Sequence, residues 1–328
     1  METVVKNSKK LVFLVLFAAV IFSTLIYVIF ALSFNHLGAN TERFSYLMRT
    51  IPSIEEWSIL AVGDSQVMED IDCTAIDKVG SECFNLGVAG ILPLQLALIK
   101  DEIAAKKPGA VLIGVSPLFF QEGVNKNDDL FFVLNNEEKD YNGFLLERFT
   151  EEEKNLLSLS KPEQLLYKRK FILSYYMNVV KSLFYKEEAS EKYVVEELKT
   201  PFQFIKIQSE EELLVKINNH ETAALFDIRN SSLREREAFV YLIRSFSEAD
   251  ISVVIVKMPL HPLIHEKVDK EAIMAFDRYI ASIEEAYKVA VLDYTSDFAA
   301  DEFTDLTHLN SEGRDRFSNQ LSLQKFNK

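Results

Sequence analysis

The stretch WSILAVGDS, residues 57–65, decides the predicted fold, because an apolar run passes directly into Gly63-Asp64-Ser65. A short, continuous apolar run is typical of a strand that is buried on both faces. Glycine marks a turn, and aspartate is a favoured N-cap for the helix that would follow it. The stretch therefore predicts a buried strand over residues 57–62, with Ser65 at the turn between strand and helix.

Outward from this stretch, apolar runs alternate with amphipathic stretches along most of the chain. Strands are predicted over residues 57–62, 82–86, 110–115, 251–257 and 289–293. Helices are predicted over residues 92–105, 232–248, 271–287 and 311–323. Apolar strands separated by helices favour a parallel sheet that is covered on both faces. We therefore expect an α/β fold, a doubly wound parallel five-stranded sheet, built from residues 57–119 and 231–328.

Residues 120–230 interrupt this alternation and are too many for a loop in a compact domain. They predict a mostly helical insertion, with helices over 147–160 and 162–185. The second of these is rich in tyrosine, phenylalanine and lysine. The insertion has three interpretations, namely a cap over the site, a surface that faces a membrane or membrane partner, and a helical unit packing on its own core.

The N-terminal segment predicts a membrane anchor. Residues 11–32 carry no charged side chain, and about 20 apolar residues are enough to span a bilayer as a helix. Three lysines precede this run, which places the N-terminus in the cytoplasm by the positive-inside rule. We expect residues 1–34 to be a cytoplasmic tip and transmembrane signal-anchor, and residues 35–56 a stalk. A cleaved signal peptide is the alternative, although its apolar region is usually shorter.

Net charge bears on the class of partner that the chain can bind, and cysteine content bears on its cellular compartment. The formal net charge is −14, which argues against nucleic acid as a partner because phosphate binding needs clustered Lys and Arg. The chain has two cysteines, Cys73 and Cys83. They are a candidate disulfide in an oxidising compartment, and two separate thiols are the equally open alternative.

Ser65 and the string Asp305-Leu306-Thr307-His308 are the candidate chemistry of the chain. A serine hydroxyl is a weak nucleophile and needs a base within hydrogen-bond reach. A carboxylate three residues before a histidine can hold that imidazole in the required tautomer. Both strings follow predicted strands, where sites gather in doubly wound sheets. Read alone, Asp305 and His308 are a turn leading into the C-terminal helix.

The same residues resemble the SGNH (GDSL-type) hydrolase superfamily. The resemblance rests on Gly63-Asp64-Ser65, on the block from Asn85 to Gly90, and on Asp305-x-x-His308. The layout is most similar to membrane-anchored cell-envelope members, such as alginate O-acetylation proteins and the D-alanyl-lipoteichoic acid transfer protein. The resemblance implies an SGNH/flavodoxin-like fold. In it Ser65 is the nucleophile, His308 the base and Asp305 the residue that orients the base.

The oxyanion hole is the part of the pattern that matches least. The resemblance implies donors from the amides of Ser65 and Gly90, and an asparagine side chain from a third block. That block falls around residues 113–119, which read IGVSPLF and contain no asparagine. The Ser116 hydroxyl is the expected replacement, and a hole made of two amides is the alternative.

His261 and His265 flank Pro262 after the fourth predicted strand. Proline disfavours the continuous helix that would align both rings on one metal ion. We expect loop or pocket-lining histidines, with His261 lining the substrate pocket, and no metal or cofactor.

Together these features predict a single-pass protein of the cell membrane with an extracytoplasmic serine esterase or O-acyltransferase domain. Its expected substrates are acyl groups of an envelope or exported polysaccharide, and its expected partner is a membrane-bound O-acyltransferase. The alternative is a non-catalytic subunit that binds glycan or docks on such an acyltransferase. A lipase with the aromatic insertion as a lid is a third interpretation.

Overall fold

The computed structural model describes residues 59–77, 82–122, 143–158 and 207–324. All of them belong to one of two compact units into which the chain divides. The predicted anchor, the stalk, the helix over 162–185 and much of the predicted insertion lie outside the described residues. Within the described ranges, no helix is both long and apolar enough to cross a bilayer.

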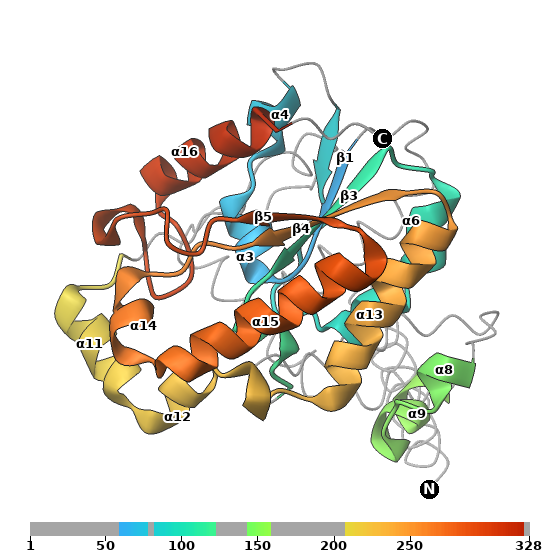
Figure 1. Ribbon diagram of the computed structural model, residues 1–328, viewed down its shortest axis with the longest axis horizontal. Helices are drawn as coiled ribbons and strands as arrows, with labels where there is room; N and C mark the ends of the chain where they lie inside the picture. The colour runs from blue at the N-terminus through green and yellow to red at the C-terminus, as the bar shows by residue number, and fades with distance from the viewer. Residues whose placement is uncertain (1–58, 78–81, 123–142, 159–206, 325–328) are drawn as a thin grey trace, which may run out of the picture. The chain divides into compact units, whose positions relative to one another are not determined.

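A five-stranded, all-parallel sheet forms the centre of the domain (Figure 1). Its order is β2-β1-β3-β4-β5, which is an arrangement known from doubly wound folds. The strands are β1 (Ile59–Val62), β2 (Cys83–Asn85), β3 (Ala110–Val115), β4 (Ser252–Lys257) and β5 (Ala290–Asp293). All five predicted strands are therefore present, and the predicted α/β fold with a five-stranded parallel sheet is confirmed.

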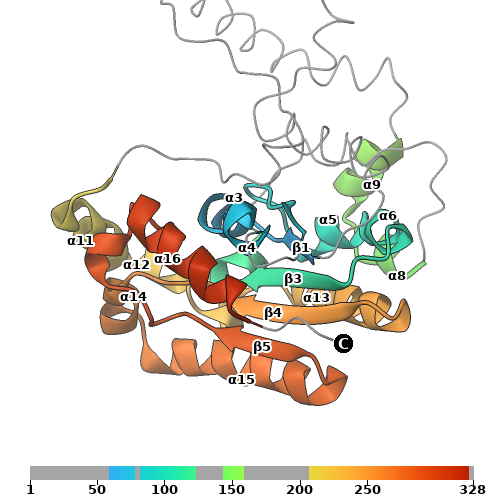
Figure 2. The ribbon, with the colours of Figure 1, turned by 90° about the horizontal axis from the view of Figure 1, so that it is seen from above.

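Helices cover both faces of the sheet. On one face, Ala61, Leu112 and Val254 share an apolar cluster with α3 (Ser65–Asp70), α4 (Cys73–Asp77) and α16 (Ser311–Ser322). Across the sheet lie α13 (Leu233–Glu248) and α15 (Lys270–Tyr287), as Figures 1 and 2 show. α13 also contacts β4, α5 (Pro93–Ala97) and α6 (Lys100–Ala105).

Three predicted helices have nearly the expected bounds, and the fourth does not. The helix predicted over 92–105 is divided into α5 and α6. Between them the amides of Leu98 and Ile99 donate to carbonyls three residues back rather than four. Such tightening of a last helical turn is common where a helix ends. No glycine or proline marks this break in the sequence, so the local pattern did not predict it.

The described parts of residues 120–230 are helical. η2 (Pro117–Phe120) ends where this range begins, and the range contains α8 (Gly143–Leu146), α9 (Glu151–Ser158), α11 (Glu210–Asn218), α12 (His220–Ala224) and η4 (Ile228–Asn230). α9 starts later than the predicted 147, because Thr150 and Glu153 cap each other's backbone amides at its N-terminus. α11 packs on α14 (Pro262–Lys267), and Leu213 and Ile217 share an apolar cluster with Ile264.

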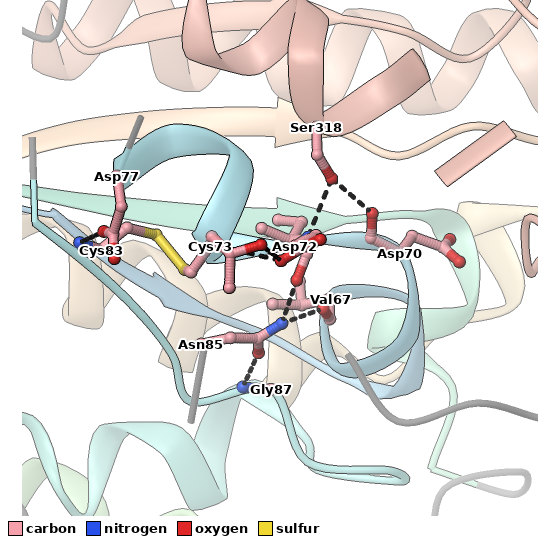
Figure 3. The surroundings of a disulfide bond; sticks show 11 residues. Val67, Asp70, Asp72, Cys73, Asp77, Cys83, Asn85, Gly87 and Ser318 are labelled. Carbon is pink, nitrogen blue, oxygen red and sulfur yellow. Dashed lines mark hydrogen bonds between the residues drawn. A yellow bond between two sulfur atoms is a disulfide. The ribbon is translucent and has the colours of Figure 1, made fainter. Parts of the chain in front are cut away.

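A disulfide joins Cys73 at the start of α4 to Cys83 at the start of β2 (Figure 3). The Cα atoms of the two residues are 5.1 Å apart. Beside it, Asp77 accepts a hydrogen bond from the Cys83 amide at 2.8 Å. The question that the sequence left open, a disulfide or two thiols, is therefore answered in favour of the disulfide.

A buried carboxyl group ties α13 to α5. Glu235 is fully buried and accepts a hydrogen bond from the Leu94 amide at 2.8 Å. Burial raises the pKa of Glu235 to about 7, against the lowering effects of the Leu94 amide and of Arg234.

We predict that Glu235 makes the domain less stable as the pH rises. A carboxyl group whose pKa is raised by folding stabilises the protein fully below its unfolded pKa, and this contribution is lost as the pH rises toward 7. Relative to Glu235→Gln, the wild-type free energy of unfolding should fall by roughly 1.4 kcal/mol per pH unit across that interval. Urea unfolding at a series of pH values measures this. Glu248→Gln, an exposed change on the same helix, is the control, and parallel curves for wild type and Glu235→Gln would contradict the prediction.

Candidate active site

Gly63 shapes the turn that presents Ser65. It has a φ of +152°, and a Cβ atom there would lie 2.5 Å from a Val67 methyl and 2.9 Å from the Gly114 carbonyl oxygen. Only glycine therefore lets β1 pass this close to β3 and into α3. Asp64 is the N-cap of α3 and accepts a hydrogen bond from the Gln66 amide, as the sequence indicated. Ser65 is the first residue of the helix and is half-buried.

A tight loop before α16 presents Asp305 and His308. Both the amide and the hydroxyl of Thr304 donate to the His308 carbonyl. Within the loop, Asp305 Oδ1 accepts hydrogen bonds from the amides of Thr307 at 2.8 Å and His308 at 2.9 Å. The Asp305 carboxylate is therefore held by the backbone of its own loop before it meets the imidazole.

The fold brings Ser65, His308 and Asp305 into one chain of contacts. Ser65 Oγ lies 2.9 Å from His308 Nε2, and His308 Nδ1 lies 2.9 Å from Asp305 Oδ2. When Nδ1 carries the proton, it donates a hydrogen bond to the Asp305 carboxylate, and Nε2 can accept a hydrogen bond from the Ser65 hydroxyl. This arrangement can remove a proton from Ser65 as the oxygen attacks an electrophile.

Two buried side chains of α3 hold the histidine loop against the serine helix. Gln66 Nε2 donates to the Thr307 carbonyl at 2.8 Å and to the Pro259 carbonyl at 3.0 Å. Asp70 Oδ1 accepts from the Leu309 amide at 2.9 Å. Because these bonds lie on both sides of His308 in the sequence, they fix the imidazole relative to Ser65.

Acidic side chains crowd around the imidazole and shift its titration. Burial disfavours the charged form of His308, but the hydrogen bond and charge of Asp305, with the charges of Glu69 and Asp70, outweigh it. Together they raise the pKa of His308 to about 10. Burial also works against ionisation of Asp305, yet its hydrogen bond from His308 holds the pKa of that carboxyl well below its usual range.

The pKa values of the other carboxyl groups beside the imidazole are raised, whereas that of Asp305 is lowered. Burial raises the pKa of Asp64 to about 6 and that of Glu69 to about 7. It also raises the pKa of Asp70 well above its usual value. The site therefore combines one strongly acidic carboxyl group with three that hold their protons more tightly.

The residues expected at the oxyanion hole follow the ends of neighbouring strands. Gly90 lies in the turn after β2 with a φ of +72°, and the Val88 amide of the same loop donates to the Gly63 carbonyl. Ser116 directly follows β3 and is 1% exposed, and its hydroxyl has no hydrogen-bond partner within the described part of the chain. A buried hydroxyl without a partner is a donor available to a ligand.

Asn85 has a structural role that the sequence did not reveal. It is fully buried, and its side-chain amide donates to the carbonyls of Val67 and Ile71, each at 2.7 Å. Its side-chain oxygen accepts from the Gly87 amide at 2.8 Å, as Figure 3 shows. A Cβ atom on Gly87 would lie 2.3 Å from the Met68 amide nitrogen. Asn85 therefore locks the loop after β2 closely against α3.

His261 and His265 follow one another across Pro262, and each imidazole has its own hydrogen-bond partner. His261 is the N-cap of α14, where its Nδ1 accepts from the Leu263 amide at 3.1 Å. Burial lowers the pKa of His261, which favours the neutral ring. His265 Nε2 lies 2.9 Å from the Thr295 carbonyl oxygen.

The ring of His261 lines a cavity of about 470 Å³. The other side chains of its wall include Leu213, Phe303 and the acidic Glu210 and Glu266. The cavity lies next to the histidine loop, because the His261 amide donates to the Leu306 carbonyl. Over the described ranges, no cluster of three His, Cys, Asp or Glu side chains is arranged to hold a metal ion.

Sequence reasoning missed three residues of the site, namely Gln66, Asp70 and Glu69, of which Glu69 lies beside Nε2 of the imidazole. Glu69 lies four residues after Ser65, so the two share a face of any helix that starts at the serine. That spacing was a usable signal, but a carboxylate there also suits an exposed helix surface.

Comparison with known proteins adds no support for the candidate active site, since no protein family and no curated protein matches the chain.

We predict that Asn85→Asp strongly destabilises the domain. The change replaces two hydrogen-bond donors by an oxygen that faces the carbonyls of Val67 and Ile71. A buried polar group left without partners costs about 1–3 kcal/mol, and more when it is charged. Urea unfolding should therefore show a loss of at least about 3 kcal/mol. Asn319→Asp, the same change at an exposed position of α16, is the control, and equal stabilities for the two variants would refute the prediction.

Proposed function

We propose that this chain is an SGNH-type serine esterase or O-acyltransferase. The observation that carries the proposal is the pair of 2.9 Å contacts that His308 makes with Ser65 and Asp305. The sheet order, with helices on both faces, is compatible with that superfamily. Ser65 and His308 also follow strand ends at the sheet edge where ligands bind in doubly wound folds.

The proposed reaction begins when Ser65 Oγ attacks an acyl carbonyl and its proton passes to His308 Nε2. The resulting oxyanion accepts hydrogen bonds from the amides of Ser65 and Gly90 and from the Ser116 hydroxyl. The tetrahedral intermediate then collapses, and His308 gives the proton to the departing alkoxide. This leaves an acyl ester on Ser65 and a free alcohol. Water or a sugar hydroxyl resolves the ester by the same steps in reverse, with Asp305 orienting the imidazole throughout.

The proposed setting is the outer side of a cell membrane. Residues 11–32 are the proposed signal-anchor, and acyl groups of an envelope or exported polysaccharide are the proposed substrates. A membrane-bound O-acyltransferase is the proposed partner. The Cys73–Cys83 disulfide supports an oxidising compartment, and the chain's two cysteines are both used in it.

A non-catalytic glycan-binding or docking subunit is the second candidate function, and two observations favour it. The third block, residues 113–119, contains no asparagine to complete an oxyanion hole, and, against the effect of burial, the hydrogen bond and charge of Asp305 raise the pKa of His308 to about 10, which favours the imidazolium in the resting site. A protonated imidazole cannot accept the serine proton. The two candidates therefore differ in whether Ser65 reacts with an electrophile.

We predict that a fluorophosphonate probe labels the purified chain at Ser65. Labelling should be lost in Ser65→Ala, and it should fall by at least about 10²-fold in His308→Gln, because general-base assistance is removed. It should also become faster as the pH rises toward 10, since only neutral His308 can accept the proton. Gel fluorescence measures the labelling, with Ser282→Ala as the exposed control. Equal labelling of wild type and Ser65→Ala, or no labelling of either, would favour the non-catalytic subunit.

We predict that the Ser116 hydroxyl contributes to turnover rather than to substrate binding. Ser116→Ala should lower kcat on a small soluble ester by at least about tenfold with little change in KM, because an oxyanion donor acts in the transition state. Ser116→Thr keeps a hydroxyl and should retain more activity. Steady-state kinetics measure both variants, and an unchanged kcat in Ser116→Ala would support a hole made of two amides only.

A further inference from the structure

Glu69 is a buried carboxyl group on the far side of the imidazole from Asp305. It is 4% exposed, and its Oε1 lies 3.8 Å from His308 Nε2, the nitrogen that also contacts Ser65 Oγ. Asp305 contacts the other ring nitrogen, Nδ1. His308 therefore lies between two carboxyl groups, one at each nitrogen of the ring.

Burial of Glu69 at this position lowers the free energy of unfolding of the domain. Its Oε1 is buried and has no hydrogen-bond partner among the described residues. A buried polar atom without a partner destabilises a protein, and a buried charge does so more strongly. A retained cost of this kind at a candidate active site suggests a role in its chemistry.

We propose that Glu69 is a positioning residue of the Ser65–His308 pair, which stabilises the imidazolium that forms when His308 takes the serine proton. The inference rests on the proposed function. Before the transfer, Nε2 presents a lone pair to the serine, and the nearby carboxylate gains nothing from it. After the transfer, Nε2 carries a proton and a positive charge 3.8 Å from Glu69 Oε1. Relative to the reactive form of the site, in which His308 is neutral, the interaction is therefore stronger in the transition state, as catalysis requires.

Glu69 does not act as a second base or as a substrate contact in this proposal. Its Oε1, the oxygen beside His308 Nε2, has almost no exposed surface, so this oxygen acts on the imidazole rather than on a substrate. No bond to Glu69 forms or breaks. The proton moves only from Ser65 Oγ to His308 Nε2 and from there to the leaving alkoxide.

Other charged groups share this environment and must be considered in any titration. Asp70 faces Glu69 and His308 from α3 itself, Asp64 does so from the N-cap of α3, and Asp305 faces them from the histidine loop. Asp70 differs from Glu69 because its Oδ1 accepts the Leu309 amide. Removing the Asp70 carboxylate would therefore disturb the loop, whereas Glu69 can be neutralised without losing a hydrogen bond.

The test combines two measurements on the purified full-length chain. The first follows the titration of His308 by NMR with isotope-labelled histidine, with the signal assigned by its loss in His308→Gln. The second follows the rate of fluorophosphonate labelling of Ser65 against pH. Glu69→Gln keeps the shape and removes the charge. Glu69→Met also keeps the approximate length of the side chain and removes the charge, and it has no polar amide. It replaces Glu69→Gln in the test if Glu69→Gln folds poorly. Glu235→Gln neutralises a buried carboxyl group remote from His308 and is the control.

We expect the His308 midpoint in Glu69→Gln to move to lower pH by about one unit, because an adjacent negative charge favours the imidazolium. The labelling profile should move in the same direction, and its plateau at high pH should fall roughly tenfold, which corresponds to about 1.4 kcal/mol of transition-state stabilisation. A residue with a purely structural role would lower the rate without moving the midpoint. Glu235→Gln should change neither quantity.

An unchanged His308 midpoint in both Glu69 variants would overturn the inference, whatever the labelling shows. A shifted midpoint with an unchanged plateau would overturn it as well, since the carboxylate would then act only on the resting site. If wild type is not labelled at all, the proposed function fails. In that case a shifted midpoint shows only an electrostatic contact between Glu69 and His308, and the proposed role of Glu69 in a reaction is refuted together with the proposed function.

Discussion

The 2.9 Å contact between Ser65 Oγ and His308 Nε2 is the interaction on which the interpretation of this protein depends. It joins residues 243 positions apart in the chain. β1 and β5 end at the same edge of the parallel sheet, with β3 and β4 between them. The segment after β5 returns toward β1, because α16 packs on α3 and α4, and the loop before α16 therefore reaches Ser65. Gln66 and Asp70 then bind the backbone on either side of His308 and remove the freedom that a loop histidine would otherwise have.

The charge of the site follows from burial of the same short helix. α3 and its N-cap contribute Glu69, Asp70 and Asp64 to a region with little solvent, and all three interact electrostatically with the imidazole of His308. A histidine surrounded in this way holds a proton strongly. For a base this lowers the fraction of reactive enzyme at neutral pH, but it also stabilises the imidazolium during proton transfer. The balance between these effects separates a catalyst active at high pH from a binding subunit, and the Ser65 probe measures it directly.

Local patterns predicted the five strands because continuous apolar runs bounded by glycine, proline and polar residues leave few alternatives to a buried strand. They failed where tertiary packing decides the local structure. The helix predicted over 92–105 divides in two without a breaker residue. The short helix α3 contains two carboxyl groups that look like exposed surface, and only burial beneath the loop before α16 shows otherwise. In the sequence Asn85 was only the first residue of a block that resembles the SGNH pattern, whereas in the structure its side-chain hydrogen bonds fix the loop after β2.

The sequence alone determined the α/β class, the order of its elements, and the choice of Ser65, Asp305 and His308 as candidates. These features are encoded in residue types and short spacings. Only the tertiary structure decided that Cys73 meets Cys83, and that a second carboxyl group, Glu69, lies beside Nε2 of the imidazole. Such contacts depend on which segments the sheet brings together in space. The distance between two side chains far apart in a chain is not contained in the local pattern around either one.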